Sequence, residues 1–291
     1  MEAARETRLR RGATVARRWA FHALTFGGPP LRRPAGYDAG SMASPARRPA
    51  GARQRAAVVV GRLAAEYPEA ECALVHTGPL QLLVATILSA QCTDERVNLV
   101  TPALFRRFPD AEAFAGADPA ELEEMVKSTG FFRAKTRAII EMSQDVVSRY
   151  GGRVPDTMEE LVTLRGVGRK TANVVLGVAF GKPGLAVDTH VTRLAGRLKL
   201  TSSSDPVQIE RDVCGLVPPS EWTNLGLRLI LHGRRVCIAR RPRCPICVLN
   251  GVCPSAELPA LVARPRLAGH RGAAKPLGAA PRGGRGRRDG A

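Results

Sequence analysis

Hydrophobic residues recur every three or four positions through the middle of the chain. The spacing is clear in the segments 55–67, 80–90, 133–150 and 191–200, and it is typical of helices that bury one face. Between residues 56 and 255 no convincing alternation of polar and apolar residues predicts a strand. The pattern therefore predicts an all-α protein of about ten helices.

Local signals predict where some of these helices begin and end. Asp118 precedes Pro119 and Glu121, so it offers an N-cap carboxylate, a proline at the first helical position and a glutamate three residues after the cap. Asp156 followed by Glu159 repeats the signal. Short turns rich in glycine, at 151–152 and 181–184, separate the helical segments.

The two ends of the chain differ from the middle in composition and charge. Residues 1–55 contain 12 arginines against 3 acidic residues, and residues 256–291 contain 8 Lys or Arg against 2 acidic residues. Both ends are also rich in Pro and Gly, so we expect a disordered basic arm over 1–50 and a disordered basic tail over 257–291. Such ends attract any polyanion, so the net charge of +18 does not by itself distinguish a DNA-binding protein from one with basic tails.

The first 55 residues leave three alternatives open. Their Arg-rich, acid-poor composition fits an organellar transit peptide, a disordered arm, or an over-extended reading frame with Met42 as the true start. No run of 18 or more apolar residues occurs, so we predict no membrane-spanning segment.

Residues 158–180 predict a helical hairpin. Two amphipathic segments flank Gly166-Val167-Gly168, and the two glycines allow a tight turn and a close approach by another backbone. The free N–H groups at the start of the second helix suit a phosphate. The hairpin is thus a candidate grip on a DNA backbone; the alternative is a hairpin whose glycines serve only packing.

Lys170 and Asp188 are the candidate catalytic residues. Lys170 falls in the first turn of the second helix, where the helix dipole disfavours an added positive charge and so favours the neutral, nucleophilic amine. Asp188 follows an apolar run and precedes a helical one, which predicts an N-cap. The same carboxylate could take a proton from the lysine or stabilise positive charge on a sugar.

Four of the seven cysteines crowd into one short segment, with the spacing Cys237-x6-Cys244-x2-Cys247-x5-Cys253. This indicates a reducing compartment and a metal centre, and four thiolates suit either a [4Fe–4S] cluster or a zinc ion. A metal clip here would present the exposed side chains of the enclosed loop as a phosphate-binding surface. The arginines of that loop are Arg240, Arg241 and Arg243. The remaining cysteines, Cys72, Cys92 and Cys214, are most simply core residues.

The segment LRGVGRKTANVVLGVAFGKPGLAVDTHVTRL resembles the helix–hairpin–helix and following loop of the endonuclease III family of DNA glycosylases. The resemblance covers residues 55 to 255 approximately, and it favours iron–sulfur over zinc. It implies two helical lobes with DNA between them. One is a barrel over 72–182 that contains the hairpin, and the other combines 51–71 with 183–256 and holds the cluster.

The resemblance also implies the chemistry. Lys170 would be the nucleophile at C1′ of the damaged nucleotide and Asp188 would assist it, giving a bifunctional glycosylase and abasic-site lyase that removes oxidised pyrimidines and nicks the strand by β-elimination. Gln91 corresponds to the residue that fills the gap left by the extruded base, and Phe131 to an apolar wedge in the opposite strand. Arg165 departs from the proline common before the first hairpin glycine, which should loosen the hairpin slightly and add a positive charge near the phosphate.

Other functions remain possible at this point. An adenine-mismatch glycosylase shares the fold, the aspartate and the cluster, but lacks lysine at the position of Lys170 and carries a further C-terminal domain. A non-catalytic DNA-binding protein and a zinc-bearing helical protein are the alternatives from other classes. The expected partner is double-stranded DNA with damaged bases or abasic sites. We expect a monomer in a bacterial cytoplasm, associated with the nucleoid, with import into an organelle as the alternative.

Overall fold

The computed structural model describes residues 49–257. The chain divides into two units, residues 1–45 and 46–291, and every described residue lies in the second unit. The predictions for the basic arm (1–50), the basic tail (257–291) and Met42 therefore lie outside the described residues, except at residues 49, 50 and 257.

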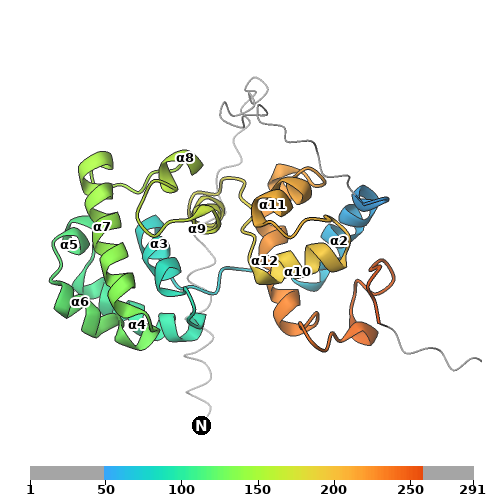
Figure 1. The fold of residues 1–291 in the computed structure, drawn as a ribbon, viewed down its shortest axis with the longest axis horizontal. Coiled ribbons are helices and arrows are strands. Elements are labelled where there is room, and N and C mark those ends of the chain that lie inside the picture. The colour runs from blue at the N-terminus through green and yellow to red at the C-terminus, as the bar shows by residue number, and fades with distance from the viewer. Residues whose placement is uncertain (1–48, 258–291) are drawn as a thin grey trace, which may run out of the picture. The chain divides into compact units, whose positions relative to one another are not determined.

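Residues 49–257 are helical and contain no strand, which confirms the predicted all-α class (Figure 1). The α-helices are α2 (Ala52–Glu66), α3 (Pro79–Leu88), α4 (Asp94–Arg107), α5 (Ala111–Ala115), α6 (Pro119–Val126), α7 (Phe132–Tyr150), α8 (Met158–Leu161), α9 (Arg169–Val174), α10 (Thr189–Arg197), α11 (Pro206–Cys214) and α12 (Trp222–Arg235). Single turns of other types are η1 (Lys127–Thr129), η3 (Pro219–Glu221) and η4 (Cys244–Ile246), which are 3₁₀, and η2 (Val175–Ala179), which is π-helical. None of the described helices is long and apolar enough to cross a membrane.

One predicted helix start is confirmed and the other is wrong by one residue. Asp118 caps α6, its carboxylate accepting from the Ala120 N–H at 3.0 Å. The cap of α8 is Thr157, whereas Asp156 forms an ion pair with Lys182 at 2.7 Å. The Thr157 hydroxyl both accepts from the backbone N–H of Glu160 and donates to its carboxylate. Thr157 and Glu160 thus partner each other at the start of α8, while the Asp156 carboxylate is engaged with Lys182.

The first helix of the predicted hairpin is also shorter than expected. The helix α8 contains only four residues. After it the chain makes three-residue turns, in which Leu164 N–H bonds to Leu161 and Val167 N–H to Leu164. Gly166 has φ +75°, a conformation that ends a right-handed helix. The second helix, α9, continues into the π-helical turn η2.

Two separate clusters of buried hydrophobic side chains form the core. One cluster extends from Leu74 to Leu176 and is built by α3 to α9 with η2. The other combines residues from Ala56 to Tyr67, in α2 and at its end, with residues from Leu185 to Leu249, in α10 to α12 and the segments beside them. Figure 1 shows the corresponding two groups of helices, with α9 in the first and α10 to α12 in the second. The chain passes from one cluster to the other twice, before α3 and after η2, so residues near these crossings lie where the two groups meet.

Candidate active site and DNA interface

The structure brings Lys170 and Asp188 together on the wall of one cavity of about 160 Å³. Lys170 is exposed and is the second residue of α9, directly after the cap Gly168 and Arg169. Asp188 is half-buried and caps α10, with its carboxylate accepting from the Val191 N–H at 2.8 Å. The cap fixes the carboxylate while leaving it on the cavity wall, so a structural and a chemical role are compatible.

Both groups of helices contribute to the rest of the cavity wall. Polar side chains that sequence reasoning did not assign to the site include Glu71, Asp94, Asn173, Thr223 and Arg234. They come from four separate segments, because Thr223 and Arg234 both lie in α12, and their local sequences contain no shared signal. Cys72, predicted to be a core residue, is half-buried and lines this cavity, whereas Cys214 is buried as predicted. Burial raises the pKa of the Cys72 thiol.

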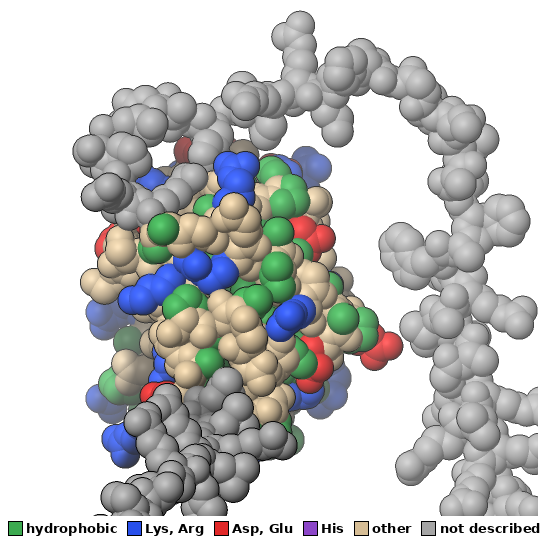
Figure 2. Space-filling model, turned by 90° about the vertical axis from the view of Figure 1, so that its right-hand side faces the viewer, with side chains coloured by type: hydrophobic (Ala, Val, Ile, Leu, Met, Phe, Trp, Pro, Cys, Tyr) green, Lys and Arg blue, Asp and Glu red, His purple; other side chains and the backbone are tan. Residues whose placement is uncertain are grey.

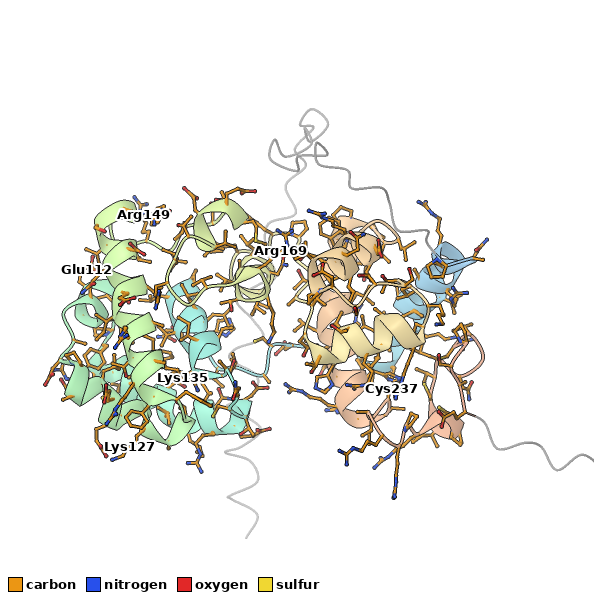
Figure 3. All side chains as sticks on the ribbon, in the orientation of Figure 1. Glu112, Lys127, Lys135, Arg149, Arg169 and Cys237 are labelled. Atoms are coloured by element: carbon orange, nitrogen blue, oxygen red, sulfur yellow. The ribbon has the colours of Figure 1, made fainter. Side chains whose placement is uncertain are left out.

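The first turn of α9 is held from the other group of helices by a buried glutamate. Glu210 of α11, only 8% exposed, accepts two hydrogen bonds from Arg169, both at 2.8 Å, and one from the Asn173 amide at 3.0 Å. Arg169 is labelled in Figure 3. Gly184 approaches the same turn so closely that a Cβ there would lie 2.7 Å from the Asn173 carbonyl oxygen. These contacts orient α9, and hence Lys170, toward the loop that leads to Asp188.

The two hairpin glycines differ in what the fold requires of them. Gly166 needs its positive φ of +75°, and a Cβ there would lie 3.0 Å from Ala138. Gly168 has an ordinary φ of −91°, and a Cβ on it would meet nothing within 4 Å. The fold itself therefore does not require glycine at 168, although a Cβ would obstruct a backbone approaching from outside. Arg165 forms an ion pair with Glu141 at 3.2 Å, so its charge is partly neutralised.

Gln91 and Phe131 are both exposed and both have left-handed backbones. Gln91 lies between α3 and α4 with φ +55°, and Phe131 caps α7 with φ +48°. The Phe131 side chain is 67% exposed. A non-glycine residue held in this conformation is strained, and here each is presented to solvent and not buried.

The four cysteines of the C-terminal segment line a second cavity together. Three nitrogen atoms lie within hydrogen-bonding distance of these sulfurs. Arg197 is 3.2 Å from Cys237 Sγ, and His232 Nε2 and the Leu249 backbone nitrogen are 3.3 Å and 3.4 Å from Cys247 Sγ. Such donors suit thiolates, as in clusters whose sulfurs are hydrogen-bonded by the protein. Across residues 49–257, no three His, Cys, Asp or Glu side chains lie close enough to share a single metal ion.

His232 connects these cysteines to α2, a link that the sequence did not suggest. Its ring is buried, with Nδ1 3.0 Å from the Tyr67 hydroxyl. Burial lowers the pKa of His232, so the ring is neutral near pH 7 and has one N–H to donate. A Tyr67 O–H that donates to Nδ1 leaves the Nε2–H to donate to Cys247, which satisfies all three groups.

Two arginines of α10 hold the loop that follows Cys237, a residue labelled in Figure 3. Arg193 donates to the Cys237 and Gly233 carbonyls, and Arg197 donates to those of Ile238 and Ala239. The predicted phosphate-binding arginines of the loop, Arg240, Arg241 and Arg243, are exposed. Figure 2 shows Lys and Arg side chains spread among apolar ones at this end of the described residues. These hydrogen bonds fix the loop to α10.

Comparisons with known proteins agree with this fold and site. Residues 84–219 match the family described as HhH-GPD superfamily base excision DNA repair protein. An endonuclease III from Synechocystis sp. is 54% identical over 217 residues, covering 74% of this chain and 99% of that protein, and an endonuclease III from Bacillus subtilis is 46% identical over 188 residues, covering 64% and 86%. A solved structure of a trapped covalent intermediate of endonuclease III with DNA is 39% identical, with a TM-score of 0.67 over 70% of this chain and 96% of that one.

The helical fold, the hairpin and the matched region define a helix–hairpin–helix protein of base excision DNA repair. The identity and coverage of the relatives are more specific. The chain belongs to the endonuclease III family of DNA glycosylases, as the sequence predicted.

Proposed function

We propose that this chain is a bifunctional DNA glycosylase and abasic-site lyase that acts on oxidised pyrimidines, with Lys170 as its nucleophile. The observation that carries the proposal is the shared cavity, which has Lys170 at the start of α9 and Asp188 at the start of α10 on its wall. The solved DNA complex of a relative, described as a trapped covalent intermediate, supports covalent chemistry between protein and DNA.

The mechanism needs an amine and a carboxylate at one sugar. Asp188 accepts a proton from the Lys170 ammonium, or stabilises positive charge on the sugar. The Lys170 nitrogen bonds to C1′ while the bond from C1′ to the base breaks, and the base leaves with that electron pair and takes up a proton. Transfer of a proton from nitrogen to O4′, with cleavage of the C1′–O4′ bond, gives a protonated Schiff base and a free 4′ hydroxyl. Removal of a C2′ proton then expels the 3′ phosphate, which nicks the strand.

Three features would hold the DNA. The hairpin, with Gly166 and Gly168, would grip a phosphate, because Gly168 is a glycine that the fold itself does not require. Gln91 would fill the gap left by the extruded nucleotide and Phe131 would wedge into the opposite strand, since both are exposed at loop tips. A further phosphate contact would come from the exposed arginines of the loop fixed by α10, namely Arg240, Arg241 and Arg243.

The residues present fit a [4Fe–4S] cluster. Cys237, Cys244, Cys247 and Cys253 line one cavity, but no three of them approach closely enough for one ion. A tetrahedral zinc site would need sulfurs roughly 3.8 Å apart, given Zn–S bonds of about 2.3 Å. When bound, the cluster would supply four iron–thiolate bonds that tie the loop to the helices, and all four ligands come from the protein. Iron and acid-labile sulfide analysis of the purified protein tests this assignment; stoichiometric zinc without iron would contradict it.

The division into lobes and the cellular setting belong to the same proposal. We take the two hydrophobic clusters as the cores of a barrel lobe (72–182) and an iron–sulfur lobe (51–71 with 183–256). The protein would act as a monomer on damaged duplex DNA or abasic sites in the cytoplasm of a bacterium.

Borohydride trapping tests the proposal. The wild type, incubated with a duplex that contains one thymine glycol, is expected to give a covalent protein–DNA adduct and Lys170→Ala none. Lys127→Ala, which changes an exposed lysine that does not line the cavity, is the matched control and should trap normally. Lys170→Gln should still bind the damaged duplex. A wild type that binds this duplex tightly but never forms an adduct would contradict the lyase, and leave a monofunctional glycosylase or a DNA-binding protein.

A further inference from the structure

Lys135 is a buried lysine without an acidic partner. It lies in the first turn of α7 and is only 5% exposed. Its ammonium donates to two backbone carbonyls, of Leu88 at 2.7 Å and of Thr129 at 2.8 Å. Lys135 is labelled in Figure 3. No carboxylate of residues 49–257 pairs with it. Burying a charge in this way is unfavourable, so a lysine here is poor for stability alone.

The two carbonyls are the ends of two helices. Leu88 is the last residue of α3, and Thr129 is the last residue of η1. Carbonyls at a helix C-terminus lack an intrahelical partner and carry partial negative charge. The ammonium of Lys135 therefore satisfies both helix ends at once, and it is the group through which they are joined.

Each of these helix ends leads directly into one of the two loops proposed to enter DNA. Gln91 follows Leu88 by three residues, and Phe131 follows Thr129 by two. Within residues 49–257, non-glycine residues with positive φ are Gln91, Phe131 and Lys199, so two of the three belong to these loops. Strained backbone persists only where its surroundings hold it in place.

We propose that Lys135 is a positioning residue that fixes the Gln91 and Phe131 loops relative to each other, so that filler and wedge enter the duplex as one unit. The proposal rests on the proposed function, in which these two side chains replace the extruded nucleotide. One ammonium with two short hydrogen bonds sets the distance between the two loop stems. Without it, each loop could still form, but their spacing would no longer be fixed.

The test compares a substrate that requires extrusion with one that does not. Single-turnover nicking is measured at an abasic site in a duplex and at the same site in the single strand, for wild type, Lys135→Met and Lys135→Arg. Lys135→Met should slow nicking of the duplex by about tenfold to a hundredfold, since a displacement of about 1 Å can have that effect. Nicking of the single strand should stay near the wild-type rate. Lys135→Arg, whose guanidinium can reach both carbonyls, should restore most of the duplex activity.

A merely structural role gives a different result. Equal losses on the duplex and the single strand, accompanied by a lower melting temperature, would overturn the proposal, as would an unchanged duplex rate in Lys135→Met. If Lys135→Met does not fold, variants of the exposed residues Gln91 and Phe131 provide the test. Gln91→Ala and Phe131→Ala are combined in the wild-type background, where a double variant no slower than the slower single variant indicates one unit. Additive losses would contradict it.

The same variants separate this inference from the proposed function. If Gln91→Ala and Phe131→Ala both leave duplex nicking at the wild-type rate, the proposed role of the two loops is wrong. If they slow it and Lys135→Met does not, only the inference about Lys135 is wrong.

Discussion

At the scale of single residues, the site depends on charged groups that are held largely out of water. Glu210 of α11 and Lys135 of α7 are 8% and 5% exposed, and each binds residues that are distant in the sequence. Glu210 bonds to the residue next to Lys170, and Lys135 bonds to the stems of the two loops. A buried charge keeps its partners in place because separating them leaves a desolvated group unpaired.

Glu210→Gln should destabilise the protein and misplace Lys170. The amide cannot accept both hydrogen bonds of the Arg169 guanidinium, so we expect a loss of about 1–3 kcal/mol, below the value for a fully buried pair because Arg169 keeps part of its hydration. Urea unfolding measures the loss. Glu121→Gln is the control, since Glu121 pairs with Arg107 in the same two-bond manner at the surface and should lose no more than about 1 kcal/mol. Equal losses in the two variants would contradict a special role for burial.

Lys135 should make stability depend on alkaline pH. Burial lowers its pKa in the folded protein, so between the folded and unfolded pKa values the unfolded chain binds more protons and folding becomes more favourable as pH rises. The free energy of unfolding of wild type, relative to Lys135→Met, should therefore increase as the pH approaches about 10, near the ordinary lysine pKa. Urea unfolding of both proteins across this range checks the slope. A constant or falling difference would show that the ammonium is not desolvated.

At the scale of elements, contacts between the two groups of helices position the site as much as the helices themselves do. The π-helical turn η2, which continues α9, packs its Gly177 against Thr223 of α12. Thr223 in turn donates to the Gly184 carbonyl at 3.1 Å, in the loop before Asp188. A π-helical turn is often found at functional sites. Here η2 continues α9, which carries Lys170, and packs against α12, which leads to the four cysteines.

Two glycine substitutions should have opposite effects. In Gly177→Ala the new Cβ would lie 2.5 Å from Thr223 Oγ1 and 3.2 Å from Thr223 Cβ, and displacing Thr223 should destabilise the protein by about 1–3 kcal/mol. In Gly196→Ala, within α10, the Cβ meets nothing within 4 Å, so helix propensity should stabilise the protein by up to about 1 kcal/mol. Thermal or urea unfolding gives both values. Stabilisation by both substitutions would show that η2 and α12 are not tightly packed.

At the scale of the whole molecule, stability and charge are located in different parts of the chain. Most of the described buried hydrophobic residues belong to two clusters, whose members lie between Ala56 and Leu249. Most of the net charge of +18 comes instead from residues 1–55 and 256–291. Charge at the ends favours binding to any DNA, whereas the cavity with Lys170 and Asp188 lies within the helical part.

A chain restricted to residues 49–257 should keep its chemistry and lose part of its general affinity for DNA. The rate of nicking at saturating protein should not change, because both hydrophobic clusters and the cavity are retained. Affinity for undamaged duplex should fall, and the plot of log affinity against log salt should become shallower by about 0.9 for each phosphate that the protein no longer neutralises. Fluorescence anisotropy titrations at several salt concentrations measure the slope. An unchanged slope would show that the basic ends do not bind DNA.

The sequence by itself determined the features that depend on neighbouring residues. Helical periodicity predicted the all-α class, the cap signal predicted the start of α6, and the spacing of residues around Lys170, Asp188 and the four cysteines indicated the family. These patterns are readable because 3.6-residue periodicity, capping and ligand spacing act over a few residues. Where two local caps competed, at Asp156 and Thr157, the ion pair of Asp156 with Lys182 was not visible from the local pattern.

Only the tertiary structure decided which distant residues hold the site in place. Arg169 and Glu210 are 41 residues apart, and Lys135 and Leu88 are 47 apart. Neither pair has a pattern in the local sequence, since a lysine or glutamate on a helix is usually a solvated residue. Such a residue gains its role when the packing of apolar faces removes water around it and leaves one partner within reach. The residues proposed to be catalytic were therefore readable from the chain, whereas the buried charges bonded near them came from the fold.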